Sequence, residues 1–157
     1  KIFSLILGFF ITLGFIKNPK IRENIFNKLV LLNLNIPTIK SPFAYVSPHA
    51  EINQGSIIMH GCIINAEANI GYNSIINTGV LIEHEAKIGN NTHISTKSVI
   101  NGQCVIKNNV FFGSNSVLAN NTTINDNIIV GAGSVVVKNL IESGVYVGNP
   151  AKIIKKY

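Results

Sequence analysis

Two neighbouring side chains, His84 and Glu85, are the strongest candidates for chemistry in this chain of 157 residues. An imidazole can remove a proton near neutral pH, and a carboxylate bonded to it fixes its tautomer and raises its basicity. A further histidine, His93, follows nine residues after His84. The same pair could equally be a solvated turn, so its meaning depends on the elements that position it.

Those elements are visible as a repeat of six residues. Every sixth position is a bulky apolar residue, and a small or slim side chain lies two positions before it. The bulky positions are Val46, Ile52, Ile58, Ile64, Ile70, Ile76, Ile82, Ile88, Ile94, Ile100, Ile106, Phe112, Leu118, Ile124, Val130 and Val136. A period of six fits neither a helix nor one amphipathic strand. It is typical of a solenoid of short strands separated by corners.

The register of this repeat predicts where each residue points. If the bulky residue is i, residues i and i−2 face inward, i−1 faces outward, and i+2 and i+3 form a corner. Three hexads close a triangular coil of 18 residues, so the repeat predicts an all-β parallel β-helix of about five coils. His84 and Glu85 then occupy a corner, whereas His93 is an outward residue on a different face.

The outward i−1 positions form apolar rows that are too continuous for a solvated surface. A closed cyclic homotrimer would bury such a row. Across its interfaces the His84–Glu85 corner of one subunit could approach His93 of another. We therefore predict a homotrimer.

Composition narrows the functional classes. Charged residues make up 13% of the chain, the net charge is +6, and basic residues gather near the two ends without interleaved aromatics. This pattern disfavours nucleic-acid binding. Cys62 and Cys104 both occupy inward i−2 positions on different faces, so we expect two buried thiols and no disulfide. Reduced thiols fit a cytoplasmic location.

The first 45 residues carry no hexads. Residues 2–16 form an apolar run that is shorter than a membrane-spanning helix and is followed by no cleavage-site pattern, although a signal or anchor stays open. Pro19 predicts the start of a helix that extends to about Leu32, with Ile21, Ile25, Leu29 and Leu32 as its apolar stripe. We expect a strand-plus-helix, partial Rossmann-like α/β segment over 1–45, the β-helix over 46–138, and a C-terminal extension over 139–157.

One stretch carries a family resemblance. The residues from Leu81 to Gly89 (Leu-Ile-Glu-His-Glu-Ala-Lys-Ile-Gly), continuing to His93-Ile94-Ser95, resemble the PglD/NeuD-type bacterial sugar acetyltransferases, which belong to the left-handed β-helix, hexapeptide-repeat acyltransferase superfamily. The end of the chain, from Gly144 to Lys152 (Gly-Val-Tyr-Val-Gly-Asn-Pro-Ala-Lys), is similar to that family's closing motif. The likeness spans roughly residues 10–157.

The resemblance implies a function and a role for each site residue. The activity would be transfer of acetyl from acetyl-CoA, without a metal, to an amino or hydroxyl group of a nucleotide-linked amino sugar or a sialic acid, for bacterial surface glycans. It assigns His84 as the general base, polarised by Glu85, and His93 as the contact to the thioester region. Its remaining site residues are Ser114 and Ala132 for the cofactor, beside Gly113, Gly131 and Gly133, and Asn77 for the acceptor.

The family's glycine-rich nucleotide-binding turn has no counterpart here, and we therefore expect the chain to be N-terminally incomplete. Two alternatives remain. The chain could be a non-catalytic or degenerate trimeric β-helix without a complete acceptor site. It could also be a zinc hydrase on the same scaffold, which needs three histidines around one metal, although the spacing of the histidines here does not match that pattern.

Overall fold

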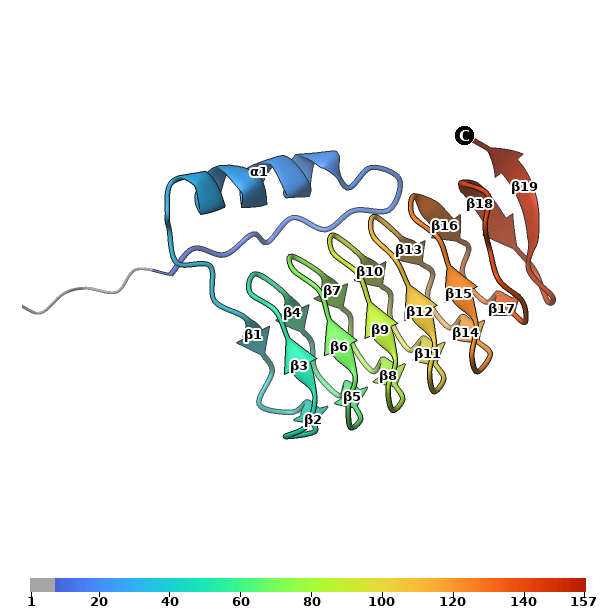
Figure 1. Cartoon of the computed structure of the whole chain (residues 1–157), viewed down its shortest axis with the longest axis horizontal. Coiled ribbons are helices and arrows are strands. Elements are labelled where there is room, and N and C mark those ends of the chain that lie inside the picture. The colour runs from blue at the N-terminus through green and yellow to red at the C-terminus, as the bar shows by residue number, and fades with distance from the viewer. Residues whose placement is uncertain (1–7) are drawn as a thin grey trace, which may run out of the picture.

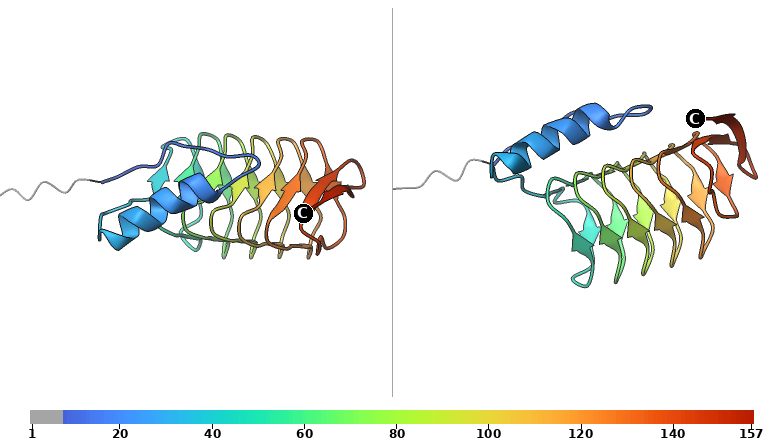
Figure 2. Two further views of the ribbon diagram at one scale, coloured as in Figure 1. Left: turned by 90° about the horizontal axis from the view of Figure 1, so that it is seen from above. Right: turned by 45° about the horizontal axis from the view of Figure 1, so that its top comes forward.

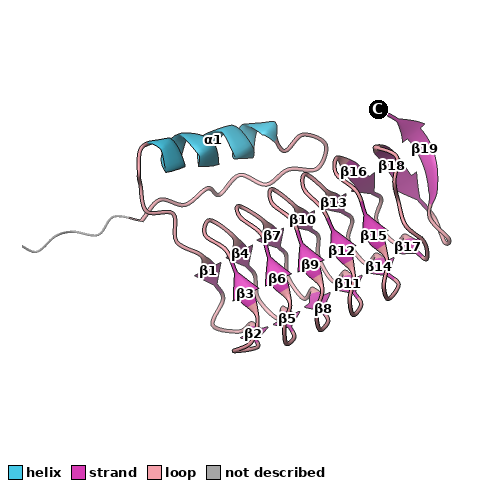
Figure 3. Cartoon of the chain, in the orientation of Figure 1, coloured by secondary structure: helices cyan, strands magenta, loops and turns pink. Residues whose placement is uncertain are grey.

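The chain folds as a triangular solenoid with one helix lying above it (Figure 1). The computed structural model describes residues 8–157. Short strands alternate with turns along the whole solenoid (Figure 3). As far as Val136, strands pair in parallel with the strand 18 residues later, as Ile57 does with Ile75, and this confirms the predicted coil of three hexads. The solenoid makes about six turns, because pairing begins at Ile39, before the first predicted hexad.

Three sheets form the sides of the prism, and we name them after their outer surfaces. The covered face contains β1 (Ile39–Lys40), β4 (Ile57–Ile58), β7 (Ile75–Ile76), β10 (His93–Ile94), β13 (Phe111–Phe112), β16 (Ile128–Val130), β18 (Gly144–Val147) and β19 (Lys152–Lys156). The bare face contains β2 (Tyr45–Val46), β5 (Ile63–Ile64), β8 (Leu81–Ile82), β11 (Val99–Ile100), β14 (Val117–Leu118) and β17 (Val135–Val136). The polar face contains β3 (Glu51–Ile52), β6 (Asn69–Ile70), β9 (Lys87–Ile88), β12 (Val105–Ile106) and β15 (Thr123–Ile124).

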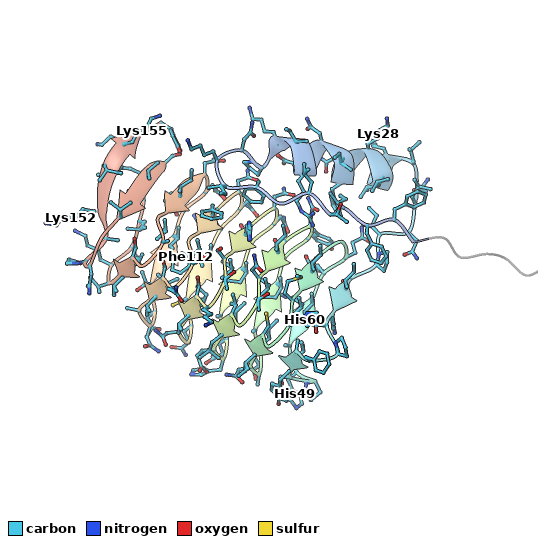
Figure 4. The ribbon with its side chains drawn as sticks, turned by 180° about the vertical axis from the view of Figure 1, so that it is seen from behind. Lys28, His49, His60, Phe112, Lys152 and Lys155 are labelled. Atoms are coloured by element: carbon cyan, nitrogen blue, oxygen red, sulfur yellow. The ribbon has the colours of Figure 1, made fainter. Side chains whose placement is uncertain are left out.

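The core is the column of inward side chains. From Ile58 to Val136 every residue at position i is at most 2% exposed, and Phe112 lies inside the prism (Figure 4). The slim residues at i−2 are buried as well, and several of their hydroxyls bond the next coil, as Ser98 does to the Gly113 carbonyl. Each buried Ile, Val or Leu contributes about 1.5–3 kcal/mol, so stacked coils stabilise a shape that one coil could not hold.

The corners explain the abundance of Asn. The residue at i+3 has a positive φ in every coil from Gly55 to Gly133, a conformation that Gly and Asn tolerate best. At the edge between the polar and covered faces, Asn side chains also form a ladder along the axis. The oxygens of Asn90 and Asn108 accept backbone N–H bonds of 2.8 Å from the preceding coil.

The three outer surfaces differ in chemistry. On the polar face the outward positions include Glu51, Asn69 and Lys87. On the bare face they are all apolar or aromatic, and nothing within residues 8–157 packs over them: Tyr45, Ile63, Leu81, Val99, Val117 and Val135. The covered face has an apolar row too, but the chain's own N-terminal segment lies over part of it (Figure 2).

That N-terminal segment differs from the sequence expectation. Residues 8–16 form no strand, and their only sheet-like pairing with the described residues is one isolated bridge, between Gly8 and Asn35. The residues before Gly8 lie outside the described part of the chain. No helix within residues 8–157 has the length and apolar character needed to cross a membrane.

Helix α1 (Lys20–Leu31) lies where Pro19 predicted a helix, but it buries a different side. The predicted stripe is largely exposed, with Ile21 at 59% and Ile25 at 40%, whereas Arg22 and Phe26 are buried. The stripe was wrong because hydrophobic spacing alone does not show that a cation can be buried. Backbone carbonyls beneath the helix accept the hydrogen bonds of the buried Arg22 guanidinium.

Candidate active site

The predicted base and its carboxylate lie together at the edge between the bare and polar faces, which we call the second edge. His84 and Glu85 follow β8, and His84 Nδ1 lies 3.0 Å from Glu85 Oε2. Both side chains are open to solvent in the single chain, at 57% and 45%. The hydrogen bond from His84, followed by one from Gln103, holds the pKa of the Glu85 carboxyl below its usual value. The ionised carboxylate therefore accepts the Nδ1 proton and leaves Nε2 free to act as a base.

His93 lies on β10 of the covered face, and its ring is buried. The rings of Phe15 and Phe111 pack edge-on against it, with centroids 5.7 and 5.2 Å away. Its Nδ1 lies 2.8 Å from the Phe15 carbonyl oxygen, which can only accept, so Nδ1 carries the proton. Nε2 then accepts from the Asn77 amide at 3.3 Å.

Burial, together with the charge of Arg22, lowers the pKa of His93 and outweighs the Phe15 carbonyl, which raises it. His93 is therefore a neutral, oriented ring at pH 7. This geometry shows that an outward strand position can be buried by a distant segment of the same chain, which the hexad register could not reveal.

This burial gives a pH prediction. The unfolded chain binds a proton on His93 near its ordinary pKa of 6.5, whereas the folded chain binds it only at lower pH. The free energy of unfolding should therefore fall as pH falls from 6.5 through the folded pKa. His93→Asn, whose amide can still donate to Phe15, should flatten this dependence, whereas His49→Asn should not. Denaturant titrations across this pH range test it, and an unchanged slope in His93→Asn would contradict it.

The residues predicted to bind cofactor and acceptor line the edge between the covered and bare faces, which we call the first edge. Asn77 follows β7, Ser114 follows β13 two coils further on, and Ala132 follows β16 on the next coil, so all three lie along this edge. Ser114 Oγ is 2.8 Å from Ser95 Oγ, and Ala132 is exposed. At roughly 4.8 Å a coil, Asn77 to Ala132 covers about 14 Å, enough for part of an extended pantetheine arm.

Two glycines beside this edge have a packing role that sequence reasoning missed. A Cβ on Gly113 would lie 2.5 Å from the Ala132 nitrogen, and one on Gly131 would lie 2.7 Å from Val147. Both are therefore required by the stacking of coils. Gly133 has a φ of 68°, and a Cβ built on it would meet open space.

Arg22 was also missed, and it ties the N-terminal segment to the solenoid. Its guanidinium donates to four backbone carbonyls, those of Ile11, Leu13, Gly55 and Asn73. Burial lowers its pKa to about 10. The carbonyls from residues 11 and 13 belong to the segment that carries Phe15, so Arg22 helps to place the carbonyl that orients His93. Arg22 is the only arginine in the chain, and this is the sequence signal that could have identified it.

A separate cleft lies away from these residues. It has a volume of about 630 Å³ and is bounded by the turn before α1 and by the polar-to-covered edge, including Lys17, Lys20, Asn109 and Tyr157. None of the predicted site residues lines it. Cys62 and Cys104 point inward as predicted, and burial raises the pKa of both thiols. Among residues 8–157, no three His, Cys, Asp or Glu side chains are grouped so as to hold a metal ion.

Comparison with known proteins decides the family. Residues 103–138 match the model for the bacterial transferase hexapeptide (six repeats). The structure is similar to PerB from Caulobacter crescentus in complex with CoA and GDP-perosamine, with a TM-score of 0.85 and 33% identity over 88% of this chain and 67% of that one. The chain belongs to the bacterial hexapeptide-repeat sugar N-acetyltransferases.

Other members of these hexapeptide-repeat acetyltransferases agree with this assignment. The acetyltransferase domain of PglB from Neisseria gonorrhoeae matches with a TM-score of 0.86 and 29% identity over 88% of this chain and 68% of that one. The same domain has been solved with acetyl coenzyme A. WeeI from Acinetobacter baumannii, at 24% identity and a TM-score of 0.83, shares the fold. This chain spans about two thirds of the length of these structures, and no curated protein sequence matched it. The predicted left-handed β-helix and family are thus confirmed.

Proposed function

We propose that this chain transfers acetyl from acetyl-CoA to an amino group, or a hydroxyl, of a nucleotide-linked amino sugar or sialic acid for bacterial surface glycans. The observation that carries the proposal is the bonded His84–Glu85 pair at a solenoid corner, in a chain 33% identical to an enzyme solved with CoA and GDP-perosamine. The two free, buried thiols fit a cytoplasmic enzyme.

The chemistry follows from the proton positions. Nε2 of His84 removes a proton from the acceptor amine while the amine nitrogen attacks the thioester carbonyl carbon. Glu85 stabilises the resulting imidazolium. The tetrahedral intermediate then collapses, the carbon–sulfur bond breaks, and CoA leaves as the thiol after taking up the proton. No covalent acyl-enzyme is needed, because the two reactants are aligned in one groove.

The role of His93 can be made more specific. Because its Nδ1–H is bonded to Phe15, Nε2 can only accept a hydrogen bond. We therefore assign His93 to an N–H group of the cofactor arm near the thioester. Asn77, whose side-chain amide lies beside His93 Nε2, would contact the acceptor. Ser114 and Ala132 would extend the groove toward the rest of the cofactor.

A homotrimer would complete this site. Three prisms that turn their bare faces toward a common axis meet edge to edge, with the first edge of one against the second edge of the next. Asn77 and His84 belong to the same coil, so they would meet at the same height across such an interface. The continuous apolar row of the bare face supports this arrangement.

The trimer can be tested with one pair of variants. Val99 and Val105 are both half-buried outward valines, one on the bare face and one on the polar face. Val99→Asp should produce monomers in sedimentation, since it places three carboxylates near the axis, whereas Val105→Asp should stay trimeric. Activity should be lost with the trimer. A Val99→Asp protein that remains trimeric would contradict the use of the bare face.

The activity itself is tested by release of free thiol from acetyl-CoA in the presence of UDP-, GDP- and dTDP-linked 4-amino sugars. Acceptor-dependent release of CoA is expected, with an N-acetylated product. Calorimetric binding of acetyl-CoA without transfer to any acceptor would instead support a non-catalytic trimer.

A further inference from the structure

The corner one coil beyond the His84–Glu85 pair is Gly102–Gln103, eighteen residues later at the same second edge. The two corners are joined by a backbone hydrogen bond of 3.0 Å from Gln103 N to the His84 carbonyl. The imidazole of His84 lies close to Gly102. A Cβ built on Gly102 would lie 2.7 Å from His84 Nε2 and 2.8 Å from Cε1, closer than side-chain atoms approach.

Gln103 supports the carboxylate of the pair. Its Nε2 donates to Glu85 Oε2 at 3.1 Å, and the same oxygen accepts the proton of His84 Nδ1 at 3.0 Å. The three side chains thus form a line in which an amide orients a carboxylate and the carboxylate orients an imidazole.

This support matters because the pair is exposed. A solvent-exposed ion pair or hydrogen bond is weak and does not by itself hold two flexible side chains in one geometry. The added donor from Gln103 and the close backbone of Gly102 limit the rotamers available to the pair. Glu85 also has a φ of 59°, so its backbone direction is already set by the corner.

We propose that Gly102 and Gln103 are positioning residues for the base: Gly102 leaves the space in which the His84 ring lies, and Gln103 holds the Glu85 carboxylate on Nδ1. This proposal rests on the proposed function of His84. It adds two residues that act through their contacts with the His–Glu pair.

Gly102→Ala tests the space beneath the ring. Gly102 is not among the positive-φ glycines, so alanine fits its backbone and should slightly stabilise the fold. The methyl group should displace the ring, and kcat should fall about 10–100-fold with little change in KM for acetyl-CoA. Asn120→Ala, at the equivalent position one coil further on, is the matched control and should keep wild-type kcat.

Gln103→Asn tests the amide. Gln103 has a φ of 59°, which asparagine tolerates well, and the shorter side chain should no longer reach Glu85. We expect a several-fold loss of kcat with no loss of stability. Asn121→Gln, the opposite exchange at the equivalent corner one coil further on, where φ is 57°, should leave kcat unchanged.

A spectroscopic readout separates this proposal from the proposed function. In ¹⁵N spectra His84 should be the Nδ1–H tautomer in the wild type, and Nε2–H should gain population in Gly102→Ala and Gln103→Asn. Unchanged tautomers and kcat in both variants would overturn the positioning roles even if His84→Ala abolishes activity. Retained activity in His84→Ala would overturn the proposed mechanism, while altered tautomers would still support the positioning roles.

Discussion

Replacing His84 by alanine should lower kcat about 10²–10⁴-fold, the usual contribution of a general base. The physical reason is the free Nε2 of a ring whose Nδ1 proton is held by Glu85 at 3.0 Å. Binding of acetyl-CoA should change little, because the first edge of the solenoid keeps its side chains. Initial rates of thiol release at saturating acetyl-CoA and acceptor would measure the loss, and calorimetry would measure cofactor binding.

His49→Ala is the matched control, since His49 lies in a corner of the same edge, between β2 and β3 (Figure 4). It should leave kcat unchanged. Glu85→Gln should lower kcat by less than His84→Ala, and the double variant should be no worse than His84→Ala alone, because residues that act as a unit are not additive. Wild-type turnover in His84→Ala would remove this ring from the chemistry.

Replacing Arg22 by methionine should release the N-terminal segment from the solenoid. The change leaves buried carbonyls of Ile11, Leu13, Gly55 and Asn73 without their donor. Unsatisfied buried groups cost about 1–3 kcal/mol each, so a loss of about 3–5 kcal/mol is expected after partial relaxation. The solenoid core does not include these contacts and should stay folded.

Hydrogen exchange would show the effect as faster exchange in residues 8–31 with unchanged protection in the central strands. Arg22→Lys should be intermediate, because one ammonium cannot reproduce the guanidinium fork. Lys28→Met, on the exposed side of the same helix, should change nothing (Figure 4). Loss of protection in the central strands of Arg22→Met would show that the segment is needed for the whole fold.

The same variant connects the segment to the site. Once Phe15 no longer accepts from His93 Nδ1, the ring loses its fixed tautomer and its neighbours, and KM for acetyl-CoA should rise. We therefore expect Arg22 to influence the proposed cofactor site through Phe15 and His93. This link between residues far apart in sequence depends on a buried cation that backbone carbonyls satisfy.

The sequence by itself determined the solenoid and the position of the His84–Glu85 pair. A period of six sets which side chains face inward, and strict burial of positions such as Ile82 and Ile100 follows from strand alternation. The register also determined that His84 and Glu85 share a corner. The corner spacing of eighteen residues also places Gly102 and Gln103 beside His84 and Glu85. Their contacts with this pair became evident only in the structure.

The tertiary structure decided what covers each outer face. Outward rows on the covered and bare faces look alike in sequence, but residues 8–31 lie over one and leave the other open. The helix buries Arg22 instead of the stripe of Ile21 and Ile25, and this burial sets the neutral state and tautomer of His93. Periodicity describes contacts within a repeat, where neighbours are set by the chain. It does not describe a docked segment, whose position depends on hydrogen bonds to carbonyls that only the folded coils bring together.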